Sequence, residues 1–191
     1  MKNGYNIDSQ YMQNNCITSD FVDKIANDVV KLLVNVNLKI STAESLTGGM
    51  ISQYITSVSG SSDIFEFGIC SYSDRIKIEK LGVNPHTIEK YTAVSENTAI
   101  EMAKGILSIS NSDIAVSTTG IAGPTGATEN MPVGTVFVCV MNKTKYICKN
   151  LSLYKKFPNA DREQNRLLTT ASALEMISEI ILQEDNNAHN W

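Results

Sequence analysis

Residues 41–49 read Ser-Thr-Ala-Glu-Ser-Leu-Thr-Gly-Gly, and the predicted fold is built outward from this stretch. Residues 36–40, just before it, have the apolar character of a short buried strand. Beyond Ser45, apolar side chains recur at a helical spacing, at Leu46, Met50, Tyr54 and Val58. The chain is therefore predicted to leave a strand, turn, and begin a helix with Ser45 in or beside its first turn. Such a helix start presents unpaired N–H groups and a positive dipole end, which suit anions and developing oxyanions.

Gly48 and Gly49 fall at this predicted helix start, where glycine is unfavourable. Each glycine inside a helix costs about 1 kcal/mol relative to alanine, so the position is expected to need a bare backbone. Two requirements fit this expectation. A ligand approaches the backbone closely, or the helix packs tightly on a sheet, and the residues alone favour neither.

The composition predicts one soluble domain. The 191 residues suffice to bury a full core, and 42% hydrophobic with 19% charged residues excludes wholesale disorder. The formal net charge of −4 argues against a nucleic-acid polymer as partner, because phosphate backbones bind basic surfaces. A small phosphorylated ligand is allowed, since it needs only one local anion site.

The sequence shows no segment expected to enter a membrane. A run of about eighteen apolar residues is absent, and the polar start lacks the layout of a signal peptide, so we expect a cytoplasmic protein without a membrane partner. The histidines, His86 and His189, do not supply a zinc cluster, so no metal is expected. The four cysteines are scattered, and those inside predicted strands are expected to be buried free thiols: Cys70, Cys139 and Cys148.

Strands and helices alternate along the chain, which predicts an α/β fold: a single-domain, three-layer α/β/α sandwich with a mixed β-sheet. Residues 1–18 are predicted to be a poorly ordered extension, residues 19–183 the domain, and residues 184–191 a polar tail. Helices are expected to start at Ser19 or Asp20, Ser73 or Asp74, Asn84, Ser95 and Asp161, the last one running to about Leu182. Further strands are expected over residues 64–72 and 114–118, and as a hairpin over 134–141 and 145–154.

A long loop follows the predicted strand at 114–118. Residues 119–133 are rich in glycine and threonine and lie near the carboxyl end of a strand, where open α/β sheets bind ligands. Loops longer than about twelve residues without structure of their own are usually functional or disordered. The loop contains neither a Walker A sequence nor a GxGxxG fingerprint, so a ligand cradle is favoured only modestly over a plain loop.

Tyr72 and Lys77 flank the end of the predicted strand at 64–72. Lys77 would lie in the first turn of the next helix, where a cation opposes the helix dipole. That placement, combined with burial, would lower the lysine pKa from about 10.4 toward the range of a general base. A solvated surface lysine is the ordinary alternative, and by itself this position favours it.

Five motifs occur in order at residues 42–49, 72–77, 93–95, 119–124 and 132–136. They read Thr-Ala-Glu-Ser-Leu-Thr-Gly-Gly, Tyr-Ser-Asp-Arg-Ile-Lys, Ala-Val-Ser, Thr-Gly-Ile-Ala-Gly-Pro and Pro-Val-Gly-Thr-Val. Together they resemble the CinA C-terminal domain family, the nicotinamide mononucleotide (NMN) amidohydrolases, over roughly Phe21 to Leu182. The resemblance implies hydrolysis of NMN to nicotinate mononucleotide and ammonia, without a metal or other cofactor.

The same resemblance implies a set of site residues. Ser45 matches the family's nucleophile, Lys77 its base, and Tyr72 an assisting residue. Substrate contacts are expected from the glycines and threonines of the motifs and from arginines early in the last helix: Thr47, Gly48, Gly49, Thr119, Gly120, Gly123, Arg162 and Arg166.

The chemistry of the residues agrees with these roles. A serine hydroxyl attacks well only when a base takes its proton, and neutral lysine can do so where histidine is missing. Neither histidine lies in a motif. Glu44 is expected to cap Ser41 or the following helix rather than to act as a catalytic acid.

Three positions depart from the family pattern. Leu46 replaces a cysteine or small residue, Met131 replaces a lysine, and Ala127 replaces a glycine. These departures put the pocket wall and a phosphate contact in question, so a related amidase with another substrate stays open. A non-catalytic nucleotide-binding or regulatory module of the same fold is the other alternative. A homo-oligomer is expected in each case.

Overall fold

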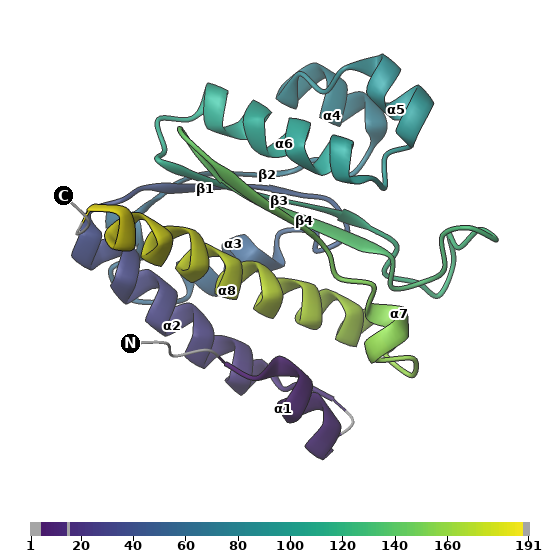
Figure 1. The fold of residues 1–191 in the computed structure, drawn as a ribbon, viewed down its shortest axis with the longest axis horizontal. Helices are drawn as coiled ribbons and strands as arrows, with labels where there is room; N and C mark the ends of the chain where they lie inside the picture. Colours follow the sequence, from purple (N-terminus) through teal and green to yellow (C-terminus); the bar gives the residue numbers. More distant parts are fainter. Residues whose placement is uncertain (1–4, 15, 189–191) are drawn as a thin grey trace.

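Five strands form one sheet at the centre of the computed structural model, which describes residues 5–14 and 16–188 (Figure 1). They are β1 (Ile40–Glu44), β2 (Phe65–Cys70), β3 (Ile114–Gly120), β4 (Val136–Asn142) and β5 (Tyr146–Asn150). The order across the sheet is β2-β1-β3-β4-β5. Strand β1 pairs in parallel with β2 and β3, whereas β3 with β4 and β4 with β5 are antiparallel. The predicted mixed sheet is confirmed.

Helices cover both faces of the sheet, as the predicted α/β/α layering requires (Figure 1). One face carries α4 (Asp74–Leu81), α5 (Pro85–Tyr91) and α6 (Glu96–Ile109). The other carries α3 (Met50–Thr56) and α8 (Arg162–Ala188), with α2 (Ser19–Val36) packed against both and α1 (Ile7–Asn14) against α8. The short helices η1 (Ser61–Asp63) and α7 (Leu153–Lys156) complete the elements. Within the described residues, none of the helices is both long and apolar enough to traverse a bilayer.

Most predicted helix starts are confirmed by a side-chain cap. An oxygen of the capping residue accepts a hydrogen bond from a first-turn N–H at Ser73, Asn84, Ser95 and Asp161. The exception is α2, which Thr18 caps by accepting from the Phe21 N–H, so the predicted Ser19 or Asp20 cap is wrong. Thr18 has the extended backbone that a cap needs, whereas the helix already includes both predicted residues.

The central strand lies later in the chain than predicted. Helix α2 continues to Val36 and ends at Asn37, which adopts the left-handed conformation with φ 53°. The strand predicted at 36–40 is therefore wrong except at Ile40, and β1 continues from Ile40 through residues 41–44 of the stretch quoted at the outset. All five are buried although three are polar, because β1 has a strand on each side and a helical layer on each face.

The ends of the other strands shift by a few residues. Strand β2 stops at Cys70, two residues before the predicted end, and β3 continues to Gly120. The start of the predicted long loop thus belongs to the sheet. The rest of that loop extends away from the body between β3 and β4 (Figure 1). The β4–β5 hairpin is confirmed, but β5 ends at Asn150, and residues 153–154 of the predicted strand belong to the helix α7.

The predicted disorder of residues 1–18 is wrong for the helix α1. Ile7, Tyr11 and Ile17 are buried, and the Tyr11 ring lies 4.5 Å from that of Phe157 between centroids. These apolar contacts explain why a polar-looking segment is ordered. At the other end, α8 continues to Ala188, beyond the predicted end of the helix. His189 and Trp191 lie outside the described residues.

A cavity of about 640 Å³ lies between α1, β5, α7 and α8, and Glu175 of α8 lines it. Its Oε1 atom is buried without a hydrogen-bond partner among the described residues. Burial raises the pKa of Glu175 to about 7, against the opposing charge of Lys149, and Asp8 and Glu179 add smaller increases. A carboxylate at this position is therefore unfavourable once it loses its proton.

We expect Glu175→Gln to stabilise the protein in a pH-dependent way. Since the folded pKa is raised above the unfolded value, stability is lost as pH rises from about 4.5 to about 7. Glutamine stays neutral, so the variant should gain about 1–2 kcal/mol of unfolding free energy at pH 8, allowing for solvent screening, and almost nothing at pH 4. Urea unfolding at both pH values measures the difference.

Glu179→Gln is the matched control, because Glu179 lies one turn away and pairs with Lys149 at 2.6 Å on the surface. Exposed pairs contribute about 0–1 kcal/mol, so this variant should show no gain at pH 8. An equal gain in both variants would contradict the assignment to Glu175.

Candidate active site

The carboxyl ends of the parallel strands bring three segments of the chain together. The Ser45 N–H donates to the Thr118 carbonyl at 3.0 Å, and the Ser71 N–H donates to the Glu44 carbonyl at 2.8 Å. Ser45 therefore lies between the ends of β2 and β3, and 8% of it is exposed. This edge is where open α/β sheets bind ligands.

Ser45 lies in a turn rather than in a helix. Residues 45–49 form this turn and α3 starts only at Met50, so the predicted helix start is too early. Gly48 and Gly49 have φ values of 63° and 94°, which non-glycine residues rarely adopt. The two glycines are thus needed for the left-handed turn, a third reason beside the two considered from the sequence.

The Glu44 carboxylate holds this turn against the start of α3. Its Oε2 accepts from the N–H groups of Gly49 and Ile51 at 3.0 Å each. Its Oε1 accepts from the Ser52 N–H at 2.9 Å and the Ser52 hydroxyl at 2.7 Å. The prediction that Glu44 caps the helix start is confirmed, and a carboxylate with four donors is well stabilised at the positive helix end.

Lys77 contacts the Ser45 hydroxyl directly. Its Nζ lies 3.2 Å from Ser45 Oγ, and it donates to the carbonyl oxygens of Ser71 at 3.0 Å and Tyr72 at 3.2 Å. Only 1% of Lys77 is exposed. The carboxylate of Asp74 lies 3.8 Å from Nζ but is itself on the surface. The surface interpretation of Lys77 is therefore wrong.

Burial lowers the pKa of Lys77, and the Asp74 carboxylate and Cys70 oppose the change. The hydrogen bonds fit both charge states. A protonated amine has three N–H groups, one for each of the three oxygens it contacts. A neutral amine has two, which the carbonyl oxygens of Ser71 and Tyr72 can accept. The lone pair then points at the Ser45 hydroxyl, as a general base requires.

Two backbone donors stand free beside Ser45. In the described part of the chain, the N–H groups of Leu46 and Thr47 have no hydrogen-bond acceptor, whereas those of Gly48, Gly49 and Met50 are paired. Unpaired donors next to a nucleophile are suited to stabilise a tetrahedral oxyanion. The Thr47 hydroxyl is buried at 2.8 Å from that of Thr118, so its side chain holds the turn on β3.

A pocket of about 720 Å³ lies between the long loop that follows β3 and the start of α8. Arg162 and Arg166 line it, one helical turn apart. Arg162 donates to the Gly123 carbonyl at 2.7 Å, and Arg166 donates to the Thr47 carbonyl at 2.7 Å. Arg162 is therefore held at the loop, and Arg166 at the turn that contains Ser45.

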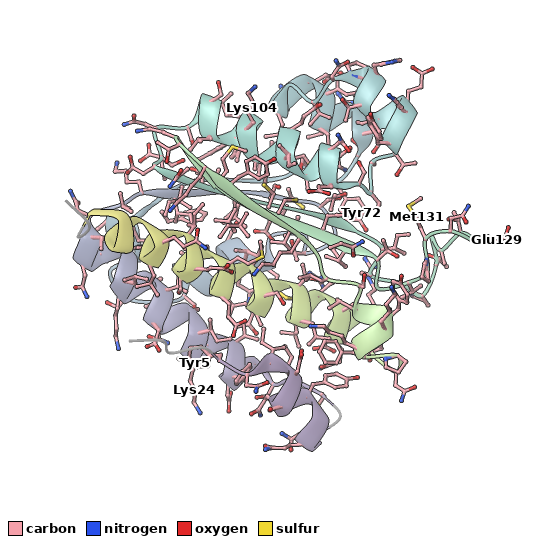
Figure 2. All side chains as sticks on the ribbon, viewed as in Figure 1. Tyr5, Lys24, Tyr72, Lys104, Glu129 and Met131 are labelled. Atoms are coloured by element: carbon pink, nitrogen blue, oxygen red, sulfur yellow. The ribbon has the colours of Figure 1, made fainter. Side chains whose placement is uncertain are left out.

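The Tyr72 side chain contacts Arg162, which lines this pocket, rather than the proposed base Lys77. Its hydroxyl accepts from Arg162 at 3.3 Å, and 61% of the residue is exposed. Figure 2 shows it at the edge of the sheet from which the long loop extends. Only the Tyr72 carbonyl contacts Lys77, so an assisting role for the hydroxyl needs a change of side-chain conformation.

The predicted loop residues differ in what they contact. Gly123 lines the pocket. Thr119 is buried and donates to the Ala93 carbonyl at 2.6 Å. At Gly120, a side chain would clash with the Thr135 carbonyl at 2.7 Å. The last two residues thus have structural reasons for their identity.

Sequence reasoning missed three contributors to the site. Ser71 supplies a carbonyl to Lys77, and Asp161 and Glu163 line the pocket beside the arginines. Ser71 directly precedes the motif at residues 72–77, and that adjacency is the sequence signal that could have identified it. Asp161 was predicted only as a helix start, and nothing in the sequence marks either carboxylate as part of a pocket, because that position depends on how the start of α8 packs against the loop.

The structure also locates two of the residues that depart from the family pattern. Leu46 is buried in the main hydrophobic core, so it does not form a wall of the pocket. Met131 lies far out on the long loop with Glu129 near its tip (Figure 2), where the Thr92 hydroxyl approaches its sulfur at 3.9 Å. Neither residue lines the pocket beside Arg162.

Comparisons with known proteins agree on one family. A family model for the CinA C-terminal domain matches residues 22–181. A CinA-like protein of Shewanella pealeana is 41% identical over 175 residues, which cover 92% of this chain and 40% of that protein. A CinA-like protein of Kosmotoga olearia is 44% identical over 154 residues, covering 81% and 36%. The chain thus spans about two fifths of the length of these curated relatives.

Solved structures give the same result. A competence/damage inducible protein from Agrobacterium tumefaciens has a TM-score of 0.79 at 33% identity, covering 83% of this chain and 94% of that one. A competence damage-inducible protein A from Klebsiella pneumoniae also has a TM-score of 0.79, at 27% identity, covering 89% and 99%. None of these names states a reaction.

Proposed function

The chain belongs to the CinA C-terminal domain family, and from this premise we propose that it hydrolyses the carboxamide of NMN to nicotinate mononucleotide and ammonia. The observation that carries the proposal is the buried contact of 3.2 Å between Lys77 Nζ and Ser45 Oγ. A serine paired with a desolvated lysine is suited to acyl transfer, and its place beside a pocket with two arginines suits an anionic substrate.

The first half of the reaction forms an acyl-enzyme. Neutral Lys77 takes the proton from Ser45 Oγ as that oxygen attacks the carboxamide carbon. The negative charge on the carbonyl oxygen is stabilised by the free N–H groups of Leu46 and Thr47. Lys77 then gives its proton to the amide nitrogen, the C–N bond breaks, and ammonia leaves with the nicotinoyl group held as an ester on Ser45.

The second half reverses these roles with water. Lys77 takes a proton from a water molecule, whose oxygen attacks the ester carbon. The proton returns to Ser45 Oγ as the ester bond breaks, and nicotinate mononucleotide is released. Apart from the substrate itself, only Ser45, Lys77 and water exchange bonds or protons in these steps, so the residues present suffice for the proposed chemistry.

The phosphate of NMN is proposed to bind Arg162, which lines the pocket and donates to the Gly123 carbonyl. A charge-assisted contact contributes about 1.5–3 kcal/mol, so Arg162→Ala should lower kcat/KM for NMN by roughly ten- to a hundredfold. Steady-state ammonia release over a range of NMN concentrations measures this loss.

Nicotinamide riboside, which lacks the phosphate, separates a loss of phosphate binding from a general disruption of the site. The Arg162→Ala variant should lose little activity toward the riboside if Arg162 contacts only the phosphate. Arg75→Ala is the surface control, because Arg75 pairs with Glu79 on the exposed side of α4. Unchanged NMN kinetics in the Arg162 variant would place the phosphate elsewhere.

The direct test of the proposed function is ammonia release from NMN, nicotinamide riboside and nicotinamide side by side. We expect activity with NMN well above that with the other two. Activity that is greatest with a substrate other than NMN would indicate a related amidase. Binding of NMN without ammonia release would indicate a nucleotide-binding module.

A further inference from the structure

Two cysteines lie directly opposite each other on β4 and β5, away from the proposed active site. Cys139 and Cys148 are register partners in the antiparallel pair. Both are free thiols in this structure. No role in the proposed reaction involves either residue.

The type of pairing follows from the hydrogen bonds at the two ends of the hairpin. The Asn142 N–H donates to the Lys145 carbonyl, and the Leu151 N–H donates to the Val136 carbonyl, at 2.9 Å each. Hydrogen-bonded and non-hydrogen-bonded pairs alternate along an antiparallel ladder. Counting inward from either end assigns Cys139–Cys148 to a non-hydrogen-bonded pair.

Side chains approach most closely at such pairs. Their Cα atoms are about 4.5 Å apart, which falls inside the range of about 4.4–6.8 Å that disulfides span. The neighbouring Cys148 thiol and burial together raise the pKa of Cys139. This shift fits two thiols that lie within reach of each other.

The surroundings distinguish the two thiols. Cys139 is fully buried in a small cluster with Ala99 and Ala103 of α6. Cys148 is only partly buried, and it lies on β5, the last strand of the sheet. An oxidant therefore reaches Cys148 first, with Cys139 behind it.

We propose that Cys139 and Cys148 form a site of reversible oxidation, closing a disulfide across the β4–β5 hairpin in the presence of a small disulfide such as oxidised glutathione. The Cys148 thiolate attacks one sulfur of oxidised glutathione, forming a mixed disulfide and releasing one glutathione. Cys139, after losing its proton, attacks the Cys148 sulfur and releases the second glutathione. The two protein thiols lose two electrons and two protons, and oxidised glutathione is reduced to two glutathione molecules.

The test uses the full chain with Cys16→Ser and Cys70→Ser, which leaves only the cross-strand pair. Cys70 is exposed, so the prediction of a buried thiol is wrong there, and it would otherwise form an adduct of its own. After treatment with oxidised glutathione under native conditions, intact mass should fall by the two hydrogen atoms, without a glutathione adduct. Dithiothreitol should restore the original mass.

Thermal unfolding supplies a second readout. A closed loop of about ten residues is expected to raise the melting temperature of a protein this size by roughly 5–10 °C. Adding Cys148→Ser to the same background should abolish both changes. A lasting glutathione adduct on Cys148, failure of the folded protein to react, or a lower melting temperature after crosslinking would overturn the proposal.

Discussion

Ammonia release from NMN is expected to fall by about 10⁴-fold or more when Ser45 is replaced with alanine, because among the described residues no other hydroxyl or thiol contacts the proposed base Lys77. Only 8% of Ser45 is exposed, and its hydroxyl contacts Lys77. The loss should appear in kcat, while NMN binding is retained through the pocket. Single-turnover assays and NMN titration measure the two quantities separately.

Ser41→Ala is the matched control for this substitution. Ser41 lies on the same strand, is fully buried, and its Oγ has no hydrogen-bond partner among the described residues. Removing that hydroxyl should leave both stability and ammonia release close to those of the wild type. Substantial activity in a folded Ser45→Ala protein would show that the nucleophile lies elsewhere.

The sequence predicted the layers of the fold and the pair at the centre of the site. Helical caps such as Ser95 and Asn84 were predictable because a cap depends on a few neighbouring residues. Ser45 and Lys77 were linked only through the resemblance of their motifs to the family, and the structure supplies the physical reason: each follows one of two adjacent parallel strands, which end at the same edge. Their contact is the result of that topology.

Features that depend on long-range packing were not predictable. Residues 40–44 include three polar side chains, so an apolar pattern did not mark them as the central strand. These residues are buried by β2, β3 and the helical layers, which come from distant parts of the chain and leave no trace in the local sequence. Helix α1 is ordered for the same reason, since its apolar side chains pack in one core with residues of α7 and α8.

The glycine turn shows a different limit. From the sequence, Gly48 and Gly49 indicated a bare backbone but not the reason for it. The left-handed φ values and the capping of α3 by Glu44 supply the reason, and both depend on where the helix starts. A boundary error of a few residues was therefore enough to change the interpretation.

Lys77→Arg is expected to be as inactive toward NMN as Lys77→Ala, with a loss of about 10³-fold or more relative to the wild type. Arginine keeps the positive charge but does not lose its proton in proteins, so it cannot accept the Ser45 proton. If Lys77 served only to attract the substrate, the arginine variant would retain activity. An active Lys77→Arg enzyme would therefore exclude Lys77 as the base.

The pH dependence tests the same role in the wild type. Because burial lowers the pKa of Lys77, the rate should rise with pH through one ionisation below the usual lysine value. That ionisation should be absent from the residual activity of Lys77→Ala. A rate that does not change with pH in this range would contradict a titrating lysine base.

Lys77→Met separates loss of the base from loss of the fold. The folded pKa of Lys77 lies below the unfolded value, so the unfolded chain binds the proton more readily and wild-type stability increases with pH toward that value. Methionine removes this penalty in a site where Lys77 is only 1% exposed. The variant should therefore be inactive yet melt at a higher temperature than the wild type at pH 7, with the difference shrinking toward pH 10. A variant that is inactive and less stable at pH 7 would instead give Lys77 a structural role.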